Sequence, residues 1–199
     1  GQNTIGEANT FLGAFAGENT NDVDRCIGIG RAAMLGTDGS TTGDNNIAIG
    51  FNSMMSVTTG TQNISIGSTS LDAMTTADNN TCLGHNTMST VTTGGSNTAI
   101  GAFALDANTT ASNNTAVGVD ALGANTTGTN NVAVGANALD ANTTSSDNTA
   151  VGLSSLTNST GSSNTALGFQ AGANVTSASN NVFLGRDAGI TGSPGGNIT

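Results

Sequence analysis

A five-residue phrase ending in glycine recurs along almost the whole chain, usually at a spacing of 17 residues. One copy is Asn114-Thr115-Ala116-Val117-Gly118, and neighbouring copies occupy residues 97–101 and 131–135. A fixed period of this length is typical of repeat architectures, in which each repeat is one structural unit stacked on the next. The glycine that ends the phrase recurs at Gly13, Gly30, Gly50, Gly67, Gly84, Gly101, Gly118, Gly135, Gly152, Gly168 and Gly185.

Two steps in this series depart from 17 residues, and both changes fall in the segment that links one phrase to the next. Three extra residues are present near residues 37–40, and one residue is missing near 158–161. Length changes that avoid the phrase indicate that the phrase is the structural rung and that the link is a surface loop.

The phrase predicts a short β-strand, because it alternates in character with period two and is rich in β-branched residues. An aliphatic residue always precedes the glycine, and a Leu or Met often lies four residues after it. We expect these two columns to form the core when rungs stack. The predicted core residues are Ile49, Ile66, Leu83, Ile100, Val117, Val134 and Val151 before the glycine, with Leu105, Leu122 and Leu139 after it.

The residue that opens the phrase is almost always Asn, and Cys26 is the one interruption. Stacked Asn side chains can form an amide ladder that satisfies polar groups from rung to rung. We therefore predict an all-β parallel β-solenoid or β-roll of about eleven 17-residue rungs. It would be one domain over residues 1–199, a fragment of a longer fibre, with irregular terminal rungs at 1–30 and 186–199. The predicted ladder is Asn46, Asn63, Asn80, Asn97, Asn114, Asn131 and Asn148.

The composition excludes several classes of function. The formal net charge is −10, with only three arginines and no lysine. Such a chain lacks the basic face that nucleic acid requires. No apolar run approaches the ~20 residues of a membrane-spanning helix, so membrane insertion is not expected.

A 17-residue rung encloses a thin core, and aromatic residues make up only 3% of the chain. One roll alone is therefore expected to be under-packed. Association with other copies, most simply as a parallel homotrimer, would supply the missing burial.

Catalytic chemistry has little support in the sequence. His85 is the only histidine, and Asp106 and Asp140 share a column but lie two rungs apart, roughly 10 Å. We predict no enzymatic activity, no cofactor and no metal site. Cys26 and Cys82 lie three rungs apart, on the order of 14 Å, so no disulfide between them is expected. Sequons such as 108–110 and 142–144 arise from the repeat itself.

Pairs of threonines in successive links offer one sharper hypothesis. Stacking would arrange them as a hydroxyl-lined stripe that could bind ice or a glycan, whereas the preference of Thr for turns explains the same pattern without a ligand. Only one residue of each pair could face a ligand. The candidate stripe is Thr109, Thr126 and Thr143.

At the phrase itself the sequence resembles two groups of repeats. One is the head of trimeric autotransporter adhesins, a parallel β-roll with an Asn-Ser-Val-Ala-Ile-Gly-like motif, and the other is the repeat region of bacteriophage tail fibres. The matching stretches are Asn46-Ile47-Ala48-Ile49-Gly50, Asn63-Ile64-Ser65-Ile66-Gly67 and Asn97-Thr98-Ala99-Ile100-Gly101. The resemblance implies a homotrimeric fibre on a virion or a cell surface that mediates attachment.

The expected function is thus a non-enzymatic structural and attachment module of an extracellular fibre. Its partners would be other copies of the chain and a host cell-surface glycan or protein. The alternatives are a ligand-binding solenoid that uses the stacked Thr residues, and a filament subunit that assembles end to end. Recognition is expected in the segments that deviate from the repeat, which are 22–26, 37–43 and 186–196.

Overall fold

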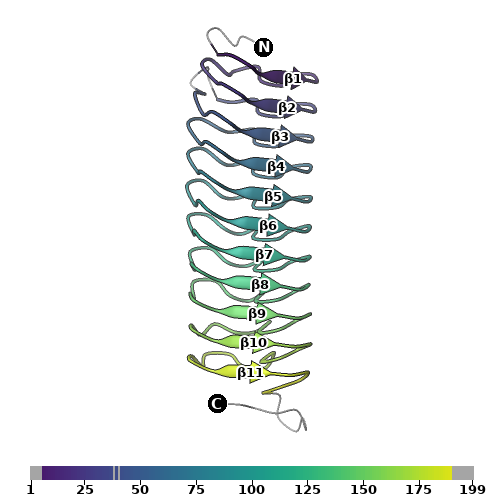
Figure 1. The fold of residues 1–199 in the computed structure, drawn as a ribbon, viewed down its shortest axis with the longest axis vertical. Helices are drawn as coiled ribbons and strands as arrows, with labels where there is room; N and C mark the ends of the chain where they lie inside the picture. The colour runs from purple at the N-terminus through teal and green to yellow at the C-terminus, as the bar shows by residue number, and fades with distance from the viewer. Residues whose placement is uncertain (1–5, 38, 40, 190–199) are drawn as a thin grey trace.

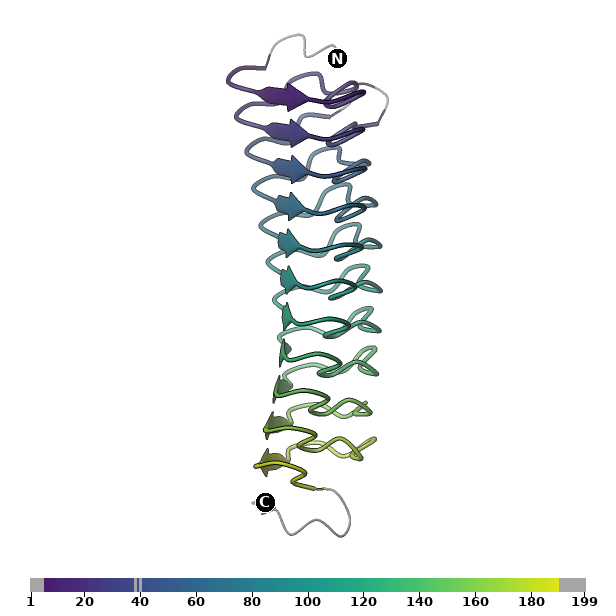
Figure 2. The same cartoon turned by 90° about the vertical axis from the view of Figure 1, so that its right-hand side faces the viewer.

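The computed structural model describes residues 6–37, 39 and 41–189, which form an all-β parallel solenoid (Figure 1). Eleven strands stack in chain order in one parallel sheet, which confirms the predicted fold class. The rod is long and narrow, and its sheet twists gradually from one end to the other (Figure 2). The strands are β1 (Thr10–Leu12), β2 (Ile27–Ile29), β3 (Ile47–Ile49), β4 (Ile64–Ile66), β5 (Thr81–Leu83), β6 (Thr98–Ile100), β7 (Thr115–Val117), β8 (Val132–Val134), β9 (Thr149–Val151), β10 (Thr165–Leu167) and β11 (Val182–Leu184).

Equivalent repeat positions stack directly on one another. Between β6 and β7, for example, Ala99 pairs with Ala116 and Ile100 pairs with Val117. Each set of stacked equivalents is called a column below and is named after its member in residues 114–130. The register is kept at both irregular spacings, between β2 and β3 and between β9 and β10. The links therefore absorb the length changes, as the sequence predicts.

The terminal segments can be placed only in part. Strands β1 and β2 lie within residues 1–30 and pair in the same register as the other strands. At the other end, residues 190–199 lie outside the described residues, and with them most of the segment 186–199.

The core is narrow, and it is filled from two opposite sides. From the strand side, the middle residue of each strand points inward, and Ala99, Ala116 and Ala133 are fully buried. From the other side the Leu122 column points inward, and Leu105, Leu122 and Leu139 are also fully buried. An inward Ala opposite an inward Leu fills the space between the two walls.

The residues that precede the anchor glycine do not form the core. Leu83 is 47% exposed and Ile66 is 37% exposed, and the other five residues of this column that were predicted as core are half-buried. The prediction was wrong because neighbouring strand residues point to opposite faces, and the small middle residue takes the inward face. The residues corrected are Ile49, Ile66, Leu83, Ile100, Val117, Val134 and Val151.

Close approach of the rungs explains the anchor glycines. Gly118 has φ +137°, in a region that L side chains rarely adopt, and a Cβ placed there would lie 2.6 Å from the carbonyl carbon of Gly135. The chain also takes left-handed turns at non-glycine residues: Leu122 has φ 53° and Leu139 has φ 54°. Such conformations cost roughly 1–2 kcal/mol each, and they persist because burial of the Leu side chain offsets the cost.

The first rung is filled differently from the middle rungs. Phe11 takes the inward strand position that a small residue fills in the middle rungs, and glycine takes the Leu122 position at Gly17. A Cβ on Gly17 would lie 2.6 Å from Cγ of Phe11, and a Cβ on Gly28 would lie 2.7 Å from its Cδ1. The Phe ring thus occupies the space that Ala and Leu share in the middle of the rod.

The last rung repeats this exchange independently. Phe183 is 5% exposed in the inward strand position. Cβ atoms on Gly189 and Gly172 would lie 2.5 and 2.9 Å from its ring. Rungs near both ends are therefore filled by Phe with Gly, and the rungs between by small residues with Leu or Met.

The amide ladder is present, and it is built from two kinds of hydrogen bond. The backbone N–H of Asn97 donates to the Asn80 amide oxygen at 3.0 Å, and Asn97 Nδ2 donates to the Ala111 carbonyl at 2.9 Å. The first bond joins neighbouring rungs and the second closes a rung on itself. Members that are at most 1% exposed are Asn46, Asn63, Asn80, Asn97, Asn114, Asn131 and Asn148.

A second, shorter set of buried amides lies in the links. Asn108, Asn125 and Asn142 are fully buried, and Asn142 Nδ2 donates to Asn125 Oδ1 at 3.0 Å. Earlier rungs fill the same column with Val57 and Val91. The sequence predicts these Asn residues as turn formers but gives no indication that they point inward.

Candidate interaction surface

One face of the rod carries the exposed large apolar side chains of the described residues, except Phe15. It consists of the outward residues of each strand, the Thr115 and Val117 columns, together with the residues that follow the anchor glycine, the Val119 column. We call these three columns the apolar face. Its most exposed members are Leu12, Leu83, Leu167 and Leu184 before the glycine and Phe51, Val119, Leu153 and Phe169 after it.

This face is large for an uncovered surface. Eleven rungs at ~4.8 Å make it about 50 Å long, and three columns at ~7 Å spacing make it about 14 Å wide. The resulting footprint is ~700 Å². Its apolar part is smaller, because Thr, Ser, His and Arg side chains share the three columns with the apolar ones. The footprint is close to the ~800 Å² that each partner contributes to a standard protein interface.

Carboxylates are absent from the apolar face among the described residues, although the chain contains 13 acidic residues. The charged side chains on it are two arginines, each stacked on aromatic rings. The Arg31 guanidinium lies 5.8 Å from the Phe15 ring and 5.4 Å from the Phe51 ring, and that of Arg186 lies 5.2 Å from Phe169. Arginine and aromatic side chains are enriched where protein interfaces hold most of their binding energy.

The paired threonines of the links form two columns with different roles, and the candidate stripe of Thr109, Thr126 and Thr143 is the first of them. Thr109 and Thr126 use their hydroxyls to donate to the backbone carbonyls of Thr126 and Thr143, at 3.2 and 3.0 Å. Those two hydroxyls hold the links together. The outward threonines belong to the neighbouring Thr127 column, whose exposed members are Thr59, Thr76, Thr93, Thr110, Thr127 and Thr144. Thr143 is itself exposed.

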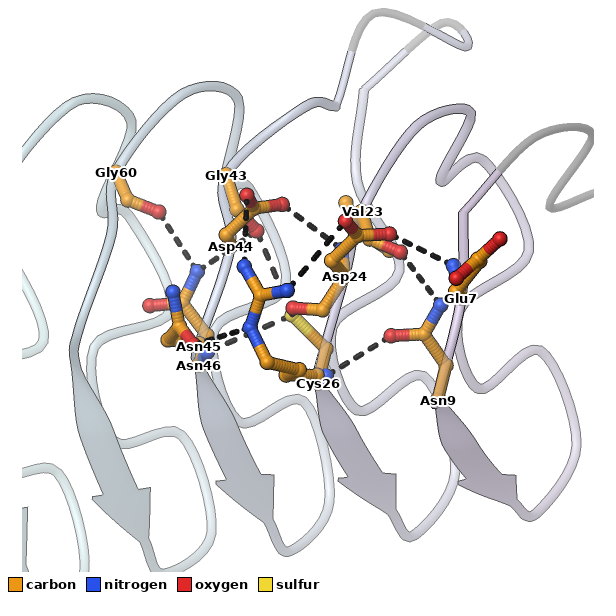
Figure 3. Close-up of polar contacts among 11 residues, drawn as sticks. Glu7, Asn9, Val23, Asp24, Cys26, Gly43, Asp44, Asn45, Asn46 and Gly60 are labelled. Atoms are coloured by element: carbon orange, nitrogen blue, oxygen red, sulfur yellow. Dashed lines mark hydrogen bonds and ion pairs between the residues drawn. The ribbon is translucent and has the colours of Figure 1, made fainter.

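The deviating segment 22–26 serves the fold (Figure 3). Asp24 accepts from the Glu7 backbone N–H at 2.7 Å, and Asp44 accepts from that of Asp24 at 2.8 Å. Arg25 donates to the Asn45 side chain at 2.8 Å and pairs with the carboxylates of Asp24 and Asp44. Of the other two segments, residues 38, 40 and 190–196 lie outside the described residues.

Cys26 replaces Asn in the amide ladder with weaker contacts. Its thiol lies 3.4 Å from the Asn46 backbone N–H and 3.5 Å from the Gly43 carbonyl. Burial raises the pKa of Cys26, and it also raises that of Cys82. Both thiols are buried and free, so neither is a reactive surface group.

Charged side chains come together chiefly at Asp24, Arg25 and Asp44 in the described part of the chain, where they form ion pairs. No three His, Cys, Asp or Glu side chains in the described part are placed to hold a metal ion. His85 is exposed and packs edge-on against Phe103 at 5.6 Å. Burial raises the pKa of Asp72 and of Asp140, with smaller contributions from the charges of Asp106 and Asp120. These carboxyls are half-buried, and each lies near one other acidic side chain.

The fold and surface together define a parallel β-solenoid with one apolar side. No family model, no curated protein and no solved structure matches the chain. Among the described residues, no helix is long and apolar enough to cross a membrane.

Proposed function

We propose that this chain is a non-enzymatic structural and attachment module of an extracellular fibre, a phage tail fibre or a bacterial surface adhesin. In it, copies associate side by side through the apolar face, most simply as a parallel homotrimer. The observation that carries the proposal is the apolar face itself, whose described residues include exposed large apolar side chains near both ends and in the middle of the rod and include no carboxylates.

A second copy is the partner that fits this face best. A partner that covers ~50 Å of surface with a repeat every ~4.8 Å must itself be a stack of rungs. Another copy meets this condition by construction, and its twist is the same. Because the acidic residues lie outside the apolar face, two copies with formal charge −10 can approach there without direct carboxylate repulsion.

The attachment role rests on the resemblance of the repeat to tail fibres and adhesin heads. A straight rod of stacked rungs suits it, because such a rod projects a binding site away from a surface. The partner would be a glycan or a protein of a host cell surface.

The assembly is tested by the mass of the purified chain in solution over a range of concentrations. Sedimentation is expected to give three times the chain mass of 19.3 kDa. The double variant Ile66→Asp, Leu83→Asp is expected to give monomers that keep the β-rich circular dichroism spectrum, because both side chains are exposed. A wild-type chain that is monomeric at every concentration overturns the proposal.

The matched control is the double variant Thr93→Asp, Thr110→Asp. It adds the same charge to the exposed Thr127 column, outside the apolar face. It should assemble like the wild type. Fibres of indefinite length in micrographs would instead indicate end-to-end assembly.

The exposed Thr127 column favours one second candidate, a ligand-binding stripe for ice or glycan. Six exposed hydroxyl-bearing residues in line at the rung spacing form a regular array. Thermal hysteresis or glycan binding that is abolished by Thr93→Lys, Thr110→Lys, Thr127→Lys supports this function. Absence of both in the wild type removes it.

A further inference from the structure

The signals for N-linked glycosylation fall into two sets that the fold treats in opposite ways. The acceptor Asn of the motif Asn-X-Ser/Thr is exposed in one set, at Asn79, Asn113, Asn158 and Asn174. In the other set the acceptor is fully buried, at Asn63, Asn108, Asn125 and Asn142.

The buried acceptors have no free amide to modify in the folded protein. Asn125 Nδ2 donates to the Gly128 carbonyl at 3.0 Å, and its Oδ1 accepts from Asn142. Asn63 Nδ2 donates to the Ala77 carbonyl at 2.7 Å. A sugar on either nitrogen would have to occupy space that neighbouring rungs already fill.

Glycosyl transfer acts on these nitrogens before the fold can protect them. The amide nitrogen attacks C1 of an oligosaccharide carried on a lipid diphosphate. The N–C bond forms as the C–O bond to the diphosphate breaks, and the amide loses one proton. The enzyme meets its acceptors while the chain is still being made and is unfolded.

The rungs cannot close fast enough to hide the acceptors. At about 5–20 residues per second, one rung takes about 1–3 s to synthesise, and a solenoid needs at least about three stacked repeats for stability. The buried acceptors therefore remain accessible for seconds.

We infer that glycosylation at the buried set and folding of this solenoid exclude one another. The protein is therefore made by a route that does not modify Asn-X-Ser/Thr. The exposed set tolerates glycans, so the incompatibility comes from four defined positions. This inference is independent of the proposed attachment function, because it concerns only how the rod can be built.

The test compares the same chain made in bacterial cytoplasm and secreted from a glycosylating eukaryotic cell behind an added signal peptide. The bacterial product is expected to be folded and resistant to protease. The eukaryotic product is expected to carry glycans at the buried set and to be lost from the secreted, protease-resistant pool. Peptide mass mapping reports the occupied sites.

The rescue variant removes the buried signals while it keeps every acceptor Asn. It combines Ser65→Ala with Thr110→Val, Thr127→Val and Thr144→Val. Ser65 belongs to the Ala116 column, in which Ala occupies several other rungs, and the three threonines are exposed. Secreted, protease-resistant protein should be recovered with this variant.

The matched control, Thr81→Val with Thr115→Val, removes two exposed signals, at a column where Val132 already occurs. It should not restore secretion. The exclusion is overturned if wild-type protein is secreted folded with its buried sites occupied. The conclusion about the production route is overturned if wild-type protein is secreted folded with those sites empty. The inference is also overturned if the rescue variant folds in bacteria but still fails to be secreted from the eukaryotic cell.

Discussion

The amide oxygen of Asn114 accepts a hydrogen bond from the backbone N–H of Asn131 at 2.9 Å, 17 residues further along the chain. The amide nitrogen of the same side chain donates to the Gly128 carbonyl at 2.9 Å. One buried side chain thus joins two rungs and closes its own, which is why Asn is kept at this position through most of the rod.

Replacing this residue should be costly and, for one substitution, dependent on pH. Asn114→Ala leaves the backbone N–H of Asn131 without a partner and removes one of the two amide donors to the Gly128 carbonyl, which keeps the bond from Asn125 Nδ2. The free energy of unfolding is expected to fall by about 1–3 kcal/mol. Asn114→Asp keeps the acceptor but sets a carboxylate against the Gly128 carbonyl. Because only the protonated acid can donate there, the pKa of the introduced carboxyl is expected to be raised in the folded state. The loss of stability in Asn114→Asp should therefore be present at neutral pH and become smaller as the pH is lowered. Chemical denaturation at pH 7 and pH 4 measures both effects.

The neighbouring residue provides the control for that experiment. Asn113 is exposed with φ 62°, and Asp147 occupies the same column with φ 63°. Asn113→Asp should leave stability within about 0.5 kcal/mol of the wild type. An equal loss in both variants would contradict the role given to the ladder.

The anchor glycines should resist even the smallest side chain. In Gly118→Ala the new Cβ would lie 2.6 Å from the Gly135 backbone, at φ +137°. We expect the free energy of unfolding to fall by several kcal/mol, at the upper end of what single substitutions cause. In Gly123→Ala the new Cβ would lie 3.0 Å from the Asp140 side chain and at ordinary contact distance, 3.4 Å, from the Asp120 carbonyl oxygen. The loss of stability should therefore be small. Thermal unfolding of the two variants, side by side, checks this contrast.

The exchange of core residues in the first rung predicts strong coupling between two substitutions. Phe11→Ala should leave a cavity, and Gly17→Leu should clash with the Phe11 ring. Together they reproduce the filling of the middle rungs, so the double variant should be more stable than the sum of the single effects predicts. A double-mutant cycle should give a favourable coupling of about 1–3 kcal/mol. Simple additivity would show that the Phe ring and the glycine do not share space.

Protonation of two half-buried carboxyls should make the rod more stable in mild acid. Burial raises the pKa of Asp72 and Asp140 above the ordinary value of 3.8. Their destabilising effect is full at neutral pH, falls as the pH drops through the raised values, and is gone below the ordinary value. Asp72→Asn with Asp140→Asn should therefore stabilise the protein at pH 7, by less than about 1 kcal/mol because solvent screens half-buried groups. An undiminished gain at pH 3 would contradict this explanation.

The repeat period alone predicts the rung number, the parallel register and the amide ladder. It does not predict which face of the strand is buried, because in a three-residue strand either the middle residue or its two neighbours could point inward. The informative signal is the size of the middle residue. Ala99, Ser65 and Cys82 are all small, which is what a narrow core facing Leu side chains requires. The outward Thr115 column varies among Thr, Ile and Val, as a partly exposed surface permits.

Other features depend on contacts that no single repeat encodes. The buried Asn108 looks like any turn-forming Asn, and only the stacking of rungs shows that it faces inward. The Phe11 exchange spans three residues in two rungs, so it becomes visible only when columns that deviate together are compared. The same is true of the apolar face, whose columns carry signals that are weak in any one rung.

The link around residues 37–40 shows that the rod separates length from register. Thr20 and Thr41 still pair across it, and β2 and β3 remain aligned although 20 residues separate their equivalents. The link of a rung can thus hold extra residues without changing the register of the strands on either side. The link is therefore a suitable site for inserting a loop, whose position along the rod would be set by the number of the rung that carries it.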